Sequence, residues 1–220
     1  IHDKGKTLKT ILNTLDEVGY VVPEPQIVNA MFFGVPQHRE RIYIVGFRKD
    51  LGLTAEDFSY PEQKEVTKKW IDVREENPVP AKYYLSTTYQ QTLIKHKARH
   101  AAKGNGFGYD IIPDDGIAHA IVVGGMGRES NLVIDFRQKD LTPTTNIKGT
   151  VNTDGWRKMT PREWARLQGY PDNFKIVVAD ASAYKQFGNS VAVPAIQATA
   201  TQLLKSLNDK NILEYGSMEI

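Results

Sequence analysis

The sequence contains no cysteine among its 220 residues. This excludes a disulfide framework, fits a reducing cytoplasm, and removes from the chain every mechanism that needs a thiolate. No apolar run approaches the roughly 20 residues that a membrane-spanning helix needs, and no segment resembles a signal peptide, so we expect no membrane partner. The formal net charge is only +2, from 28 basic and 26 acidic residues, so any basic surface must come from local clustering.

The length of the chain and its hydrophobic content of 40% allow one sizeable core or two small domains. Residue 1 is Ile rather than Met. We therefore expect a processed, truncated or excised piece of a longer protein.

The first 66 residues have the pattern of an α/β protein. Apolar residues recur at helical spacing before Gly19, which supplies a stop; they are Leu8, Ile11, Leu12, Leu15 and Val18. Apolar runs at residues 27–33 and 42–47 predict two strands, separated by the breaker sequence at residues 34–36. A helix followed by strands predicts the trailing part of an α/β sheet.

The middle of the chain is less regular. Residues 50–80 read as a passage between domains, and residues 86–102 predict a helix with Leu93, Ile94 and Ala98 facing inward. Residues 104–157 are rich in glycine and contain short β-like runs at residues 120–123 and 131–136. This pattern predicts a small domain of strands and loops, and such loops commonly carry binding groups.

The last third returns to helices. Thr160, Pro161 and Glu163 form the sequence pattern of a capping box with proline at the first helical position. A second helix is expected to end near Gly188, and a third begins at Pro194. The apolar face of that third helix comprises Ile196, Ala200, Leu203, Leu204 and Leu207.

Two arginines stand close together at residues 37–41, QHRER. If the extended backbone begins at Gln37, alternation places Gln37, Arg39, Arg41 and Tyr43 on one face. Neighbouring guanidiniums repel unless something accepts their hydrogen bonds, and a carboxylate, a phosphate or a base carbonyl would serve. A salt-bridge network at a strand end is the structural alternative.

Two further segments offer polar groups to a ligand. The junction at Gly188, Asn189, Ser190 and Val191 presents backbone N–H groups and a hydroxyl, although it also fits a plain turn between helices. Residues 141–149 collect hydroxyls, an amide and a lysine that can reach bases and phosphates, although a polar surface loop is the simpler explanation. Nearby glycines, and the basic residues Arg128, Arg157 and Lys158, would add close approach and charge.

No metal site or nucleotide-phosphate loop is expected. His96 and His100 stand four residues apart, which allows a shared helix face, but no carboxylate or cysteine follows at a diagnostic spacing. The GNGFG run at residues 104–108 lacks the strand–turn–helix context of a phosphate-binding loop and predicts a flexible loop.

Three ordered segments together resemble one family. Residues 34–48, GVPQHRERIYIVGFR, resemble the Gln-x-Arg-x-Arg block of DNA cytosine-5 methyltransferases of the bacterial restriction-modification type. Residues 157–174, RKMTPREWARLQGYPDNF, resemble the block that follows their target-recognition region, and residues 184–194, YKQFGNSVAVP, resemble their closing Gly-Asn-Ser-Val block. Residues 2–7 resemble the stretch just after that family's Glu-Asn-Val motif. The resemblance spans nearly the whole chain, with the middle as its variable part.

The resemblance implies a particular chemistry. The enzyme flips a cytosine out of duplex DNA, a cysteine thiolate attacks carbon 6, and carbon 5 then takes a methyl group from S-adenosylmethionine. By match, Arg41 binds the carbonyl of the flipped cytosine, while Arg39 and Gln37 support the pocket and the catalytic loop.

The match also assigns other residues. Asn189, Ser190 and Val191 close the cofactor site. Thr144 and Thr145, with Lys148 and Gly149, fall where the family has a Thr-containing DNA-recognition motif. Arg162 and Arg166 match arginines that organise the domain junction.

The resemblance also implies a domain plan. Residues 1–66 are the trailing part of the catalytic domain, residues 67–157 are the target-recognition domain, and residues 158–220 are helices returning to the catalytic domain. The fold class is therefore α/β: the C-terminal part of a Rossmann-like methyltransferase sheet plus a small β-rich target-recognition domain.

The sequence departs from the family in what it lacks. The Pro-Cys motif, the Glu-Asn-Val motif and the early Phe-x-Gly-x-Gly cofactor loop are missing. The chain is therefore expected to be inactive alone and to need an N-terminal catalytic half, from the same chain or a separate subunit, that carries most of the cofactor site. The start at Ile1 favours an excised piece with exposed apolar surface. A non-catalytic DNA-binding or regulatory subunit is the first alternative, and an unrelated α/β enzyme that binds an anionic substrate through Arg39 and Arg41 is the second.

Overall fold

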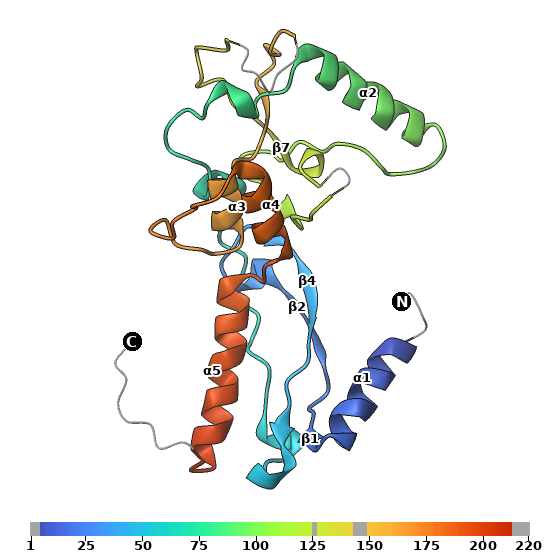
Figure 1. The fold of residues 1–220 in the computed structure, drawn as a ribbon, viewed down its shortest axis with the longest axis vertical. Helices are drawn as coiled ribbons and strands as arrows, with labels where there is room; N and C mark the ends of the chain where they lie inside the picture. The colour runs from blue at the N-terminus through green and yellow to red at the C-terminus, as the bar shows by residue number, and fades with distance from the viewer. Residues whose placement is uncertain (1–4, 125–126, 143–148, 213–220) are drawn as a thin grey trace. The chain divides into compact units, whose positions relative to one another are not determined.

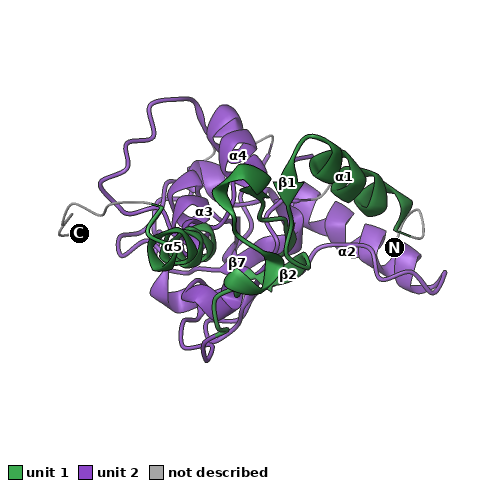
Figure 2. Cartoon of the chain, turned by 90° about the horizontal axis from the view of Figure 1, so that it is seen from below, with its two compact units in different colours: residues 1–29, 40–63, 195–220 green, residues 30–39, 64–194 purple. Residues whose placement is uncertain are grey.

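A computed structural model describes residues 5–124, 127–142 and 149–212 of the chain (Figure 1). Its mixed helix and strand content confirms the expected α/β class. The chain forms two compact units, which Figure 2 colours separately. Unit 1 comprises Ile1–Asn29, Glu40–Gln63 and Ala195–Ile220, and unit 2 comprises Ala30–Arg39 and Lys64–Pro194.

Unit 1 contains two strand pairs and two long helices. Helix α1 (Lys6–Glu17) leads into β1 (Tyr20–Val21), which pairs antiparallel with β5 (Phe47–Arg48). Strand β2 (Gln26–Asn29) pairs antiparallel with β4 (Glu40–Tyr43), and 3-10 turns follow at Lys49–Leu51 and Ala55–Asp57. The last helix, α5 (Val193–Asp209), has nearly all its length in this unit.

The core of unit 1 is small. It consists of Val45, Phe47, Leu53 and Phe58, against which Leu203 and Leu207 of α5 pack. Helix α1 contributes no buried residue, although its apolar residues share one side as predicted. Large apolar side chains accordingly remain exposed in this unit: Ile11, Val18, Ile27, Ile42, Ile196 and Leu204.

Unit 2 contains the larger core. Strand β3 (Gln37–His38) pairs parallel with β6 (Ala118–His119), and β7 (Leu132–Ile134) pairs antiparallel with β8 (Trp156–Lys158). Its helices are α2 (Thr87–Ala101), α3 (Pro161–Leu167) and α4 (Asp180–Asn189), with 3-10 turns at Ala30–Phe33, Trp70–Asp72, Ala81–Tyr83 and Glu129–Asn131. The core gathers Trp70, Ile121, Met159, Trp164 and Phe187 around α3 and α4.

The helix boundaries follow from local chemistry. The Ser86 hydroxyl accepts a hydrogen bond from the Tyr89 N–H and caps α2. Thr160 and Glu163 form the predicted capping box at the start of α3. Gly169 follows α3 with a φ of +79°, and a Cβ there would lie 2.4 Å from Cδ of Pro194, so only glycine fits. The helices predicted near residues 8–18, 86–102, 160–167 and 194–207 are confirmed.

Several finer predictions are wrong. The strand expected at residues 27–33 ends at Asn29 and becomes a 3-10 turn, and residues 120–123 are not a strand. Ala98 is exposed rather than inward-facing. Ile196, Ala200 and Leu204 of the predicted apolar face are also exposed, whereas α5 buries Thr199 and Ser206, whose hydroxyls donate to carbonyls one turn back.

The compact units do not coincide with the three-part division expected from the sequence. Residues 30–39 and 158–194 belong to the same unit as residues 64–157. In the ranges that the structure describes, no helix combines the length and apolarity that a membrane crossing requires.

Candidate functional site

Gln37 is completely buried, and its side-chain amide forms hydrogen bonds with the main chain of two segments that are distant in the sequence. Its Nε2 donates to the Leu167 carbonyl at 2.8 Å, and its Oε1 accepts from the Ile121 N–H at 3.0 Å. Gln168, at the end of α3, donates from its Nε2 to the Phe187 carbonyl at 2.8 Å. These amides tie β3 to the ends of α3 and α4.

Arg39 follows β3 and is 4% exposed. Its Nη1 donates to the Ile121 carbonyl at 2.7 Å. Its Nη2 donates to the carbonyls of Gly188 and Ser190 at 3.1 and 2.8 Å. A buried guanidinium requires such acceptors, and charge-assisted bonds to carbonyl oxygens are stronger than neutral ones. Arg39 therefore holds the turn at Gly188 and Ser190 through main-chain carbonyls.

Arg41 has a different environment. It lies in β4, its side chain is exposed, and its Nη1 donates to the Glu40 carbonyl at 2.6 Å. The expected alternation along residues 37–43 is broken at Arg39, where the chain leaves β3 before it enters β4. Gln37, Arg39 and Tyr43 are buried whereas Arg41 is not, so the predicted single face for all four residues is wrong. Arg41 presents most of the five donors of its guanidinium to solvent.

The turn after α4 is fixed by buried hydrogen bonds, whereas two of its side chains face solvent. Ser190 caps α4, and its hydroxyl donates to the Phe187 carbonyl at 2.9 Å. The side chains of Asn189 and Val191 are exposed. This turn thus offers an amide and an apolar group on a main chain that Arg39 fixes.

The residues predicted to contact DNA are only partly described. Thr144, Thr145 and Lys148 lie outside the described residues. Gly149 is described; it is exposed and has a φ of +92°.

Arg157 and Lys158 were expected to add charge at a DNA contact, but both side chains pair with carboxylates of this chain. Arg157 is 0% exposed; its Nη1 and Nη2 each donate to Glu163 at 2.8 Å, and its Nε donates to Asp135 at 3.0 Å. Lys158 pairs with Glu129 at 3.0 Å. Arg157 therefore cannot reach DNA, and the prediction for this residue is wrong.

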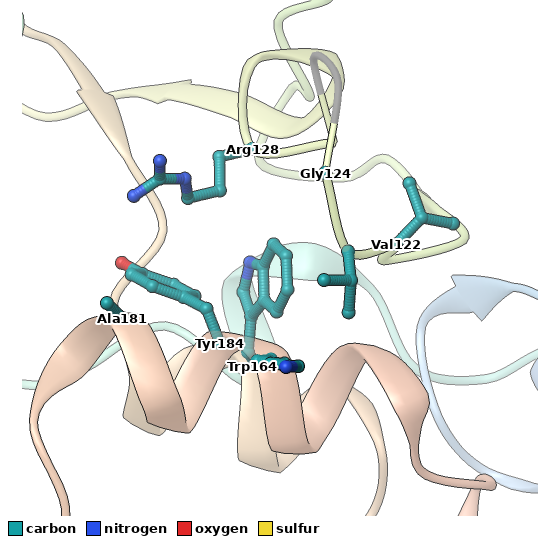
Figure 3. A pocket seen from close by; sticks show the side chains of 8 residues that line it. Val122, Gly124, Arg128, Trp164, Ala181 and Tyr184 are labelled. Carbon is teal, nitrogen blue, oxygen red and sulfur yellow. The ribbon is translucent and has the colours of Figure 1, made fainter.

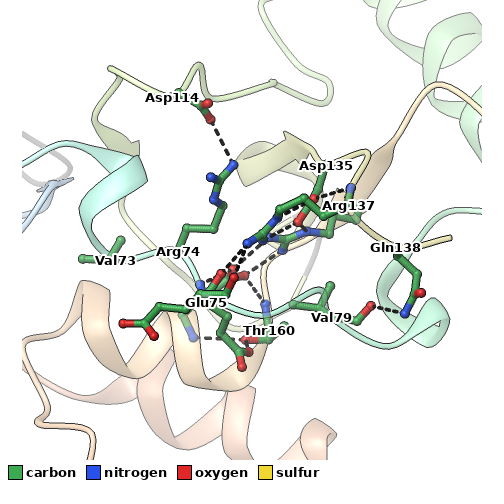
Figure 4. Close-up of polar contacts among 12 residues, drawn as sticks. Val73, Arg74, Glu75, Val79, Asp114, Asp135, Arg137, Gln138 and Thr160 are labelled. Atoms are coloured by element: carbon green, nitrogen blue, oxygen red, sulfur yellow. Dashed lines mark hydrogen bonds and ion pairs between the residues drawn. The ribbon is translucent and has the colours of Figure 1, made fainter.

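Asp135 also binds Arg137, which lies beside Glu75 (Figure 4). Arg137 donates to Asp135 and to the carbonyls of Glu75 and Glu76. Burial alone would raise the pKa of Asp135, but the hydrogen bonds from Arg137 and the charges of Arg157 and Arg137 hold that pKa well below its usual range. Asp135 therefore remains ionised throughout the neutral range.

Arg162 and Arg166, matched to domain-organising arginines, hold neighbouring segments of unit 2. Arg166 forms a bidentate pair with Asp172 at 2.7 and 2.9 Å and donates to the Arg74 carbonyl at 2.8 Å. Arg162 donates to the Phe174 carbonyl at 2.7 Å. These contacts fix the segment after α3.

A pocket of about 140 Å³ in unit 2 went unnoticed in the sequence. Figure 3 shows Arg128 reaching toward the rings of Trp164 and Tyr184, with Val122 and Gly124 on the facing loop. The Arg128 guanidinium lies 5.3 Å from the centre of the Tyr184 ring. Burial raises the pKa of Tyr184 far above its usual value, so its hydroxyl stays protonated and donates to the Met159 carbonyl at 2.5 Å. The spacing of these residues in the sequence does not indicate that α3, α4 and this loop meet at one pocket.

His96 and His100 share one face of α2, as their spacing predicts, with ring centres 4.4 Å apart. Within the described ranges, no group of three or more His, Cys, Asp or Glu side chains is placed to hold a metal ion.

The sequence model of the family C-5 cytosine-specific DNA methylase matches residues 1–205. The chain belongs to this family. It is 69% identical to the type II methyltransferase M.HpaII of Haemophilus parainfluenzae, over 94% of this chain and 58% of that protein. It is 39% identical to the type II methyltransferase M.SsoII of Shigella sonnei, over 94% of this chain and 50% of that protein. The chain thus spans between half and three fifths of the length of these two relatives.

Solved structures show the same fold. The Entamoeba histolytica methyltransferase EhMeth superimposes with a TM-score of 0.63 at 21% identity, over 95% of this chain and 59% of that one. The S. pombe Dnmt2 methyltransferase also superimposes with a TM-score of 0.63, at 18% identity, over 94% of this chain and 64% of that one. The predicted family and the methyltransferase fold are therefore confirmed.

Proposed function

We propose that this chain is the DNA-recognising part of an enzyme that transfers a methyl group from S-adenosylmethionine to carbon 5 of cytosine in a specific duplex DNA sequence. The observation that carries the proposal is the family match over residues 1–205. The names of M.HpaII and M.SsoII identify both as type II methyltransferases, which supports a role in restriction-modification.

Arg41 is the residue assigned to the flipped cytosine. It is exposed, and it donates a hydrogen bond to the adjacent Glu40 carbonyl. An arginine fork with donors left over can bind the carbonyl oxygen of a base, which becomes more negative when a nucleophile adds to the ring. Arg41 thus acts on the substrate directly.

Gln37 and Arg39 are positioning residues. Their side chains donate to main-chain carbonyls at Leu167, Gly188 and Ser190, so they do not face a substrate. They fix the turn after α4 relative to β3 within unit 2.

The turn at residues 189–191 fits a role in closing the cofactor site. Asn189 and Val191 expose an amide and an apolar side chain, which suit the polar and apolar parts of S-adenosylmethionine. The cofactor supplies the electrophilic methyl group when it is bound. The contribution of this chain is to hold the turn in place through Arg39.

Gly149, with Thr144, Thr145 and Lys148, is assigned to DNA recognition by the family motif. We place these residues in a target-recognition domain at residues 67–157, between catalytic-domain segments at residues 1–66 and 158–220. The exposed and positive-φ Gly149 supports this assignment because it permits close approach of the main chain to a ligand.

The nucleophilic thiolate must come from outside these 220 residues, which contain no cysteine. We therefore propose that the chain works with an N-terminal catalytic half, in the same polypeptide or as a separate subunit. The exposed Ile11, Ile27 and Ile42 of unit 1 supply apolar surface that such a half would cover.

A methyl-transfer assay tests the proposal. The 220-residue chain alone is expected to methylate no DNA, and co-expression with a polypeptide carrying the family's Pro-Cys motif is expected to restore transfer to cytosine. Transfer by the pure chain would refute the missing-thiolate argument. Duplex binding without transfer under any complementation would instead identify a non-catalytic DNA-binding subunit, which the lack of cysteine also allows.

Substitution of Arg41 tests its role in the complemented enzyme. Arg41→Ala is expected to lower methyl transfer by about 100-fold or more, the range for loss of one transition-state donor, while duplex affinity stays within about threefold. Arg48→Ala, at an exposed arginine of β5 paired with Asp50, is the matched control and is expected to leave both unchanged. Equal losses of transfer and affinity in Arg41→Ala would assign it to general DNA binding.

A further inference from the structure

Four basic residues of unit 2 cluster on and just after helix α2. Residues 95–110 contain four basic residues, Lys95, Lys97, Arg99 and Lys103, and one acidic residue, Asp110. This segment therefore carries a net charge of +3, whereas the whole chain carries +2. Helix α2 itself contains no acidic residue. The local clustering that a basic surface requires is thus present here.

One side of α2 is anchored to the core. Leu93 is 3% exposed and packs with Leu85 and Leu132. Gln90 donates to Asp154 at 2.8 Å. Helical geometry places Lys95 and Arg99, four residues apart, on the side opposite Leu93, and both are exposed.

These exposed cations have no internal counter-charge. In the part of the chain that the structure describes, Lys95, Arg99 and Lys103 form no ion pair, whereas Lys97 lies 4.0 Å from Asp110. Like charges four residues apart on a helix repel one another by a few tenths of a kcal/mol. An anionic ligand relieves that repulsion and gains from all three charges.

The loop after α2 has a defined structure and carries an exposed aromatic ring. Gly104, with a φ of +73°, ends the helix, and the Asn105 N–H donates to the His100 carbonyl at 3.0 Å. A Cβ at Gly108 would lie 2.9 Å from the Lys97 side chain, so the loop closes tightly on α2. Phe107 is 67% exposed, with its ring centre 5.8 Å from that of His100.

We infer that the exposed side of α2 and the loop at residues 104–109 form a second DNA-contacting surface, outside the family's motif blocks. Lys95, Arg99 and Lys103 contact phosphates of duplex DNA, and Phe107 packs against sugar or base edges beside them. Positive charges without partners next to an exposed aromatic ring suit a nucleic-acid backbone better than a protein partner. The inference rests on the proposed function, because it adds a contact to the same DNA substrate.

Lysine footprinting on the unaltered chain tests the inference without a folding risk. Acetylation of each lysine is measured by mass spectrometry with and without a duplex oligonucleotide. Lys95 and Lys103 are expected to be protected, while the exposed Lys6, Lys9 and Lys205 of unit 1 remain reactive. Unchanged reactivity at Lys95 and Lys103 on a chain that binds the duplex would overturn the inference and leave the proposed function standing. Failure of the enzyme complemented with its N-terminal half to bind any duplex would instead contradict the proposed function.

Charge neutralisation measures the number of contacts. The triple variant Lys95→Gln, Arg99→Gln, Lys103→Gln keeps residues with good helix propensity and is expected to lower the slope of log affinity against log salt concentration by about 2.7. The control Lys6→Gln, Lys9→Gln, Lys205→Gln removes the same charge and is expected to leave the slope unchanged. Equal slopes for the two triple variants would show only a general charge effect and reject the surface.

Phe107→Ala tests the aromatic contact separately. It is expected to weaken duplex binding about fivefold without changing the salt slope, and Phe107→Tyr is expected to restore it. Unchanged affinity in Phe107→Ala would remove this residue from the surface.

Discussion

Two groups of arginines in this chain have opposite environments. Arg39 and Arg157 are buried, and carbonyls or carboxylates of their own unit accept the hydrogen bonds of their guanidiniums. Arg41 and Arg99 are exposed and lack carboxylate partners among the described residues. The comparison teaches that a basic residue near a binding motif is informative only when its acceptors are known. Buried arginines organise the main chain, and exposed ones remain available to a ligand.

Arg157→Met provides the strongest test on the buried side. Removal of this guanidinium leaves Glu163 buried without the cation that pairs with it and leaves Asp135 with Arg137 alone, and breaking such a network costs about 3–5 kcal/mol. The free energy of unfolding, measured by urea titration of the chain, is expected to fall by this amount. A loss below about 1 kcal/mol would mean that the network is solvated in solution.

Arg39→Ala is expected to have the next largest effect. It leaves the carbonyls of Ile121 and Gly188 without this donor, and hydrogen bonds to a charged group contribute about 1.5–3 kcal/mol each. We expect a loss of about 3 kcal/mol in the free energy of unfolding, the sum of the lower values for two such bonds. Arg39→Lys should recover only part of it, because an ammonium cannot reproduce the planar fork. Full recovery by lysine would show that charge alone matters at this position.

The stability of unit 2 at acid pH tests the buried group of arginines through their partner Asp135. The folded-state pKa of Asp135 is held below its unfolded value of 3.8, so its ionisation contributes stability that is fully present above pH 3.8 and is lost as the pH falls toward the folded pKa. The difference in melting temperature between the parent chain and Asp135→Asn is therefore expected to be largest near neutral pH and to shrink below pH 4. A constant difference from pH 7 to pH 3 would contradict the depressed pKa.

The exposed arginines are expected to give the smallest effects on stability. Within the residues that the structure describes, neither Arg41 nor Arg99 donates a hydrogen bond to an acceptor in the core. Arg41→Ala and Arg99→Gln should therefore each change the free energy of unfolding by less than about 0.5 kcal/mol. The same urea titration measures both. A loss near that of Arg39→Ala would place them with the buried group.

Much of the fold follows from local sequence signals. Apolar periodicity and the capping box at Thr160 and Glu163 predicted the helices correctly because the interactions that define them span three or four residues. The strands are two to four residues long, so alternation had too few positions to locate their ends. Similarly, α5 buries Thr199 and Ser206, because their hydroxyls find acceptors in the preceding turn.

The site was harder to predict because its contacts are distant in the chain. Resemblance singled out Gln37 and Arg39, but their acceptors lie 82 to 151 residues further on, at Ile121, Leu167, Gly188 and Ser190. Spacing alone therefore gave no indication that the two side chains are buried. The pocket beside Arg128 and Trp164 was missed for the same reason.

The insertion of residues 30–39 into unit 2 has a consequence for protein engineering. Exchange of the recognition region between relatives is simplest when the exchanged piece is one uninterrupted stretch. Here the pairing of β3 with β6 and the bond from the Ile121 N–H to Gln37 join β3 to a segment 84 residues further on. A chimera that exchanges residues 64–157 alone keeps these contacts only if the new segment places its main-chain groups in the same positions, so a graft that also carries residues 30–39 preserves both sides of the pairing.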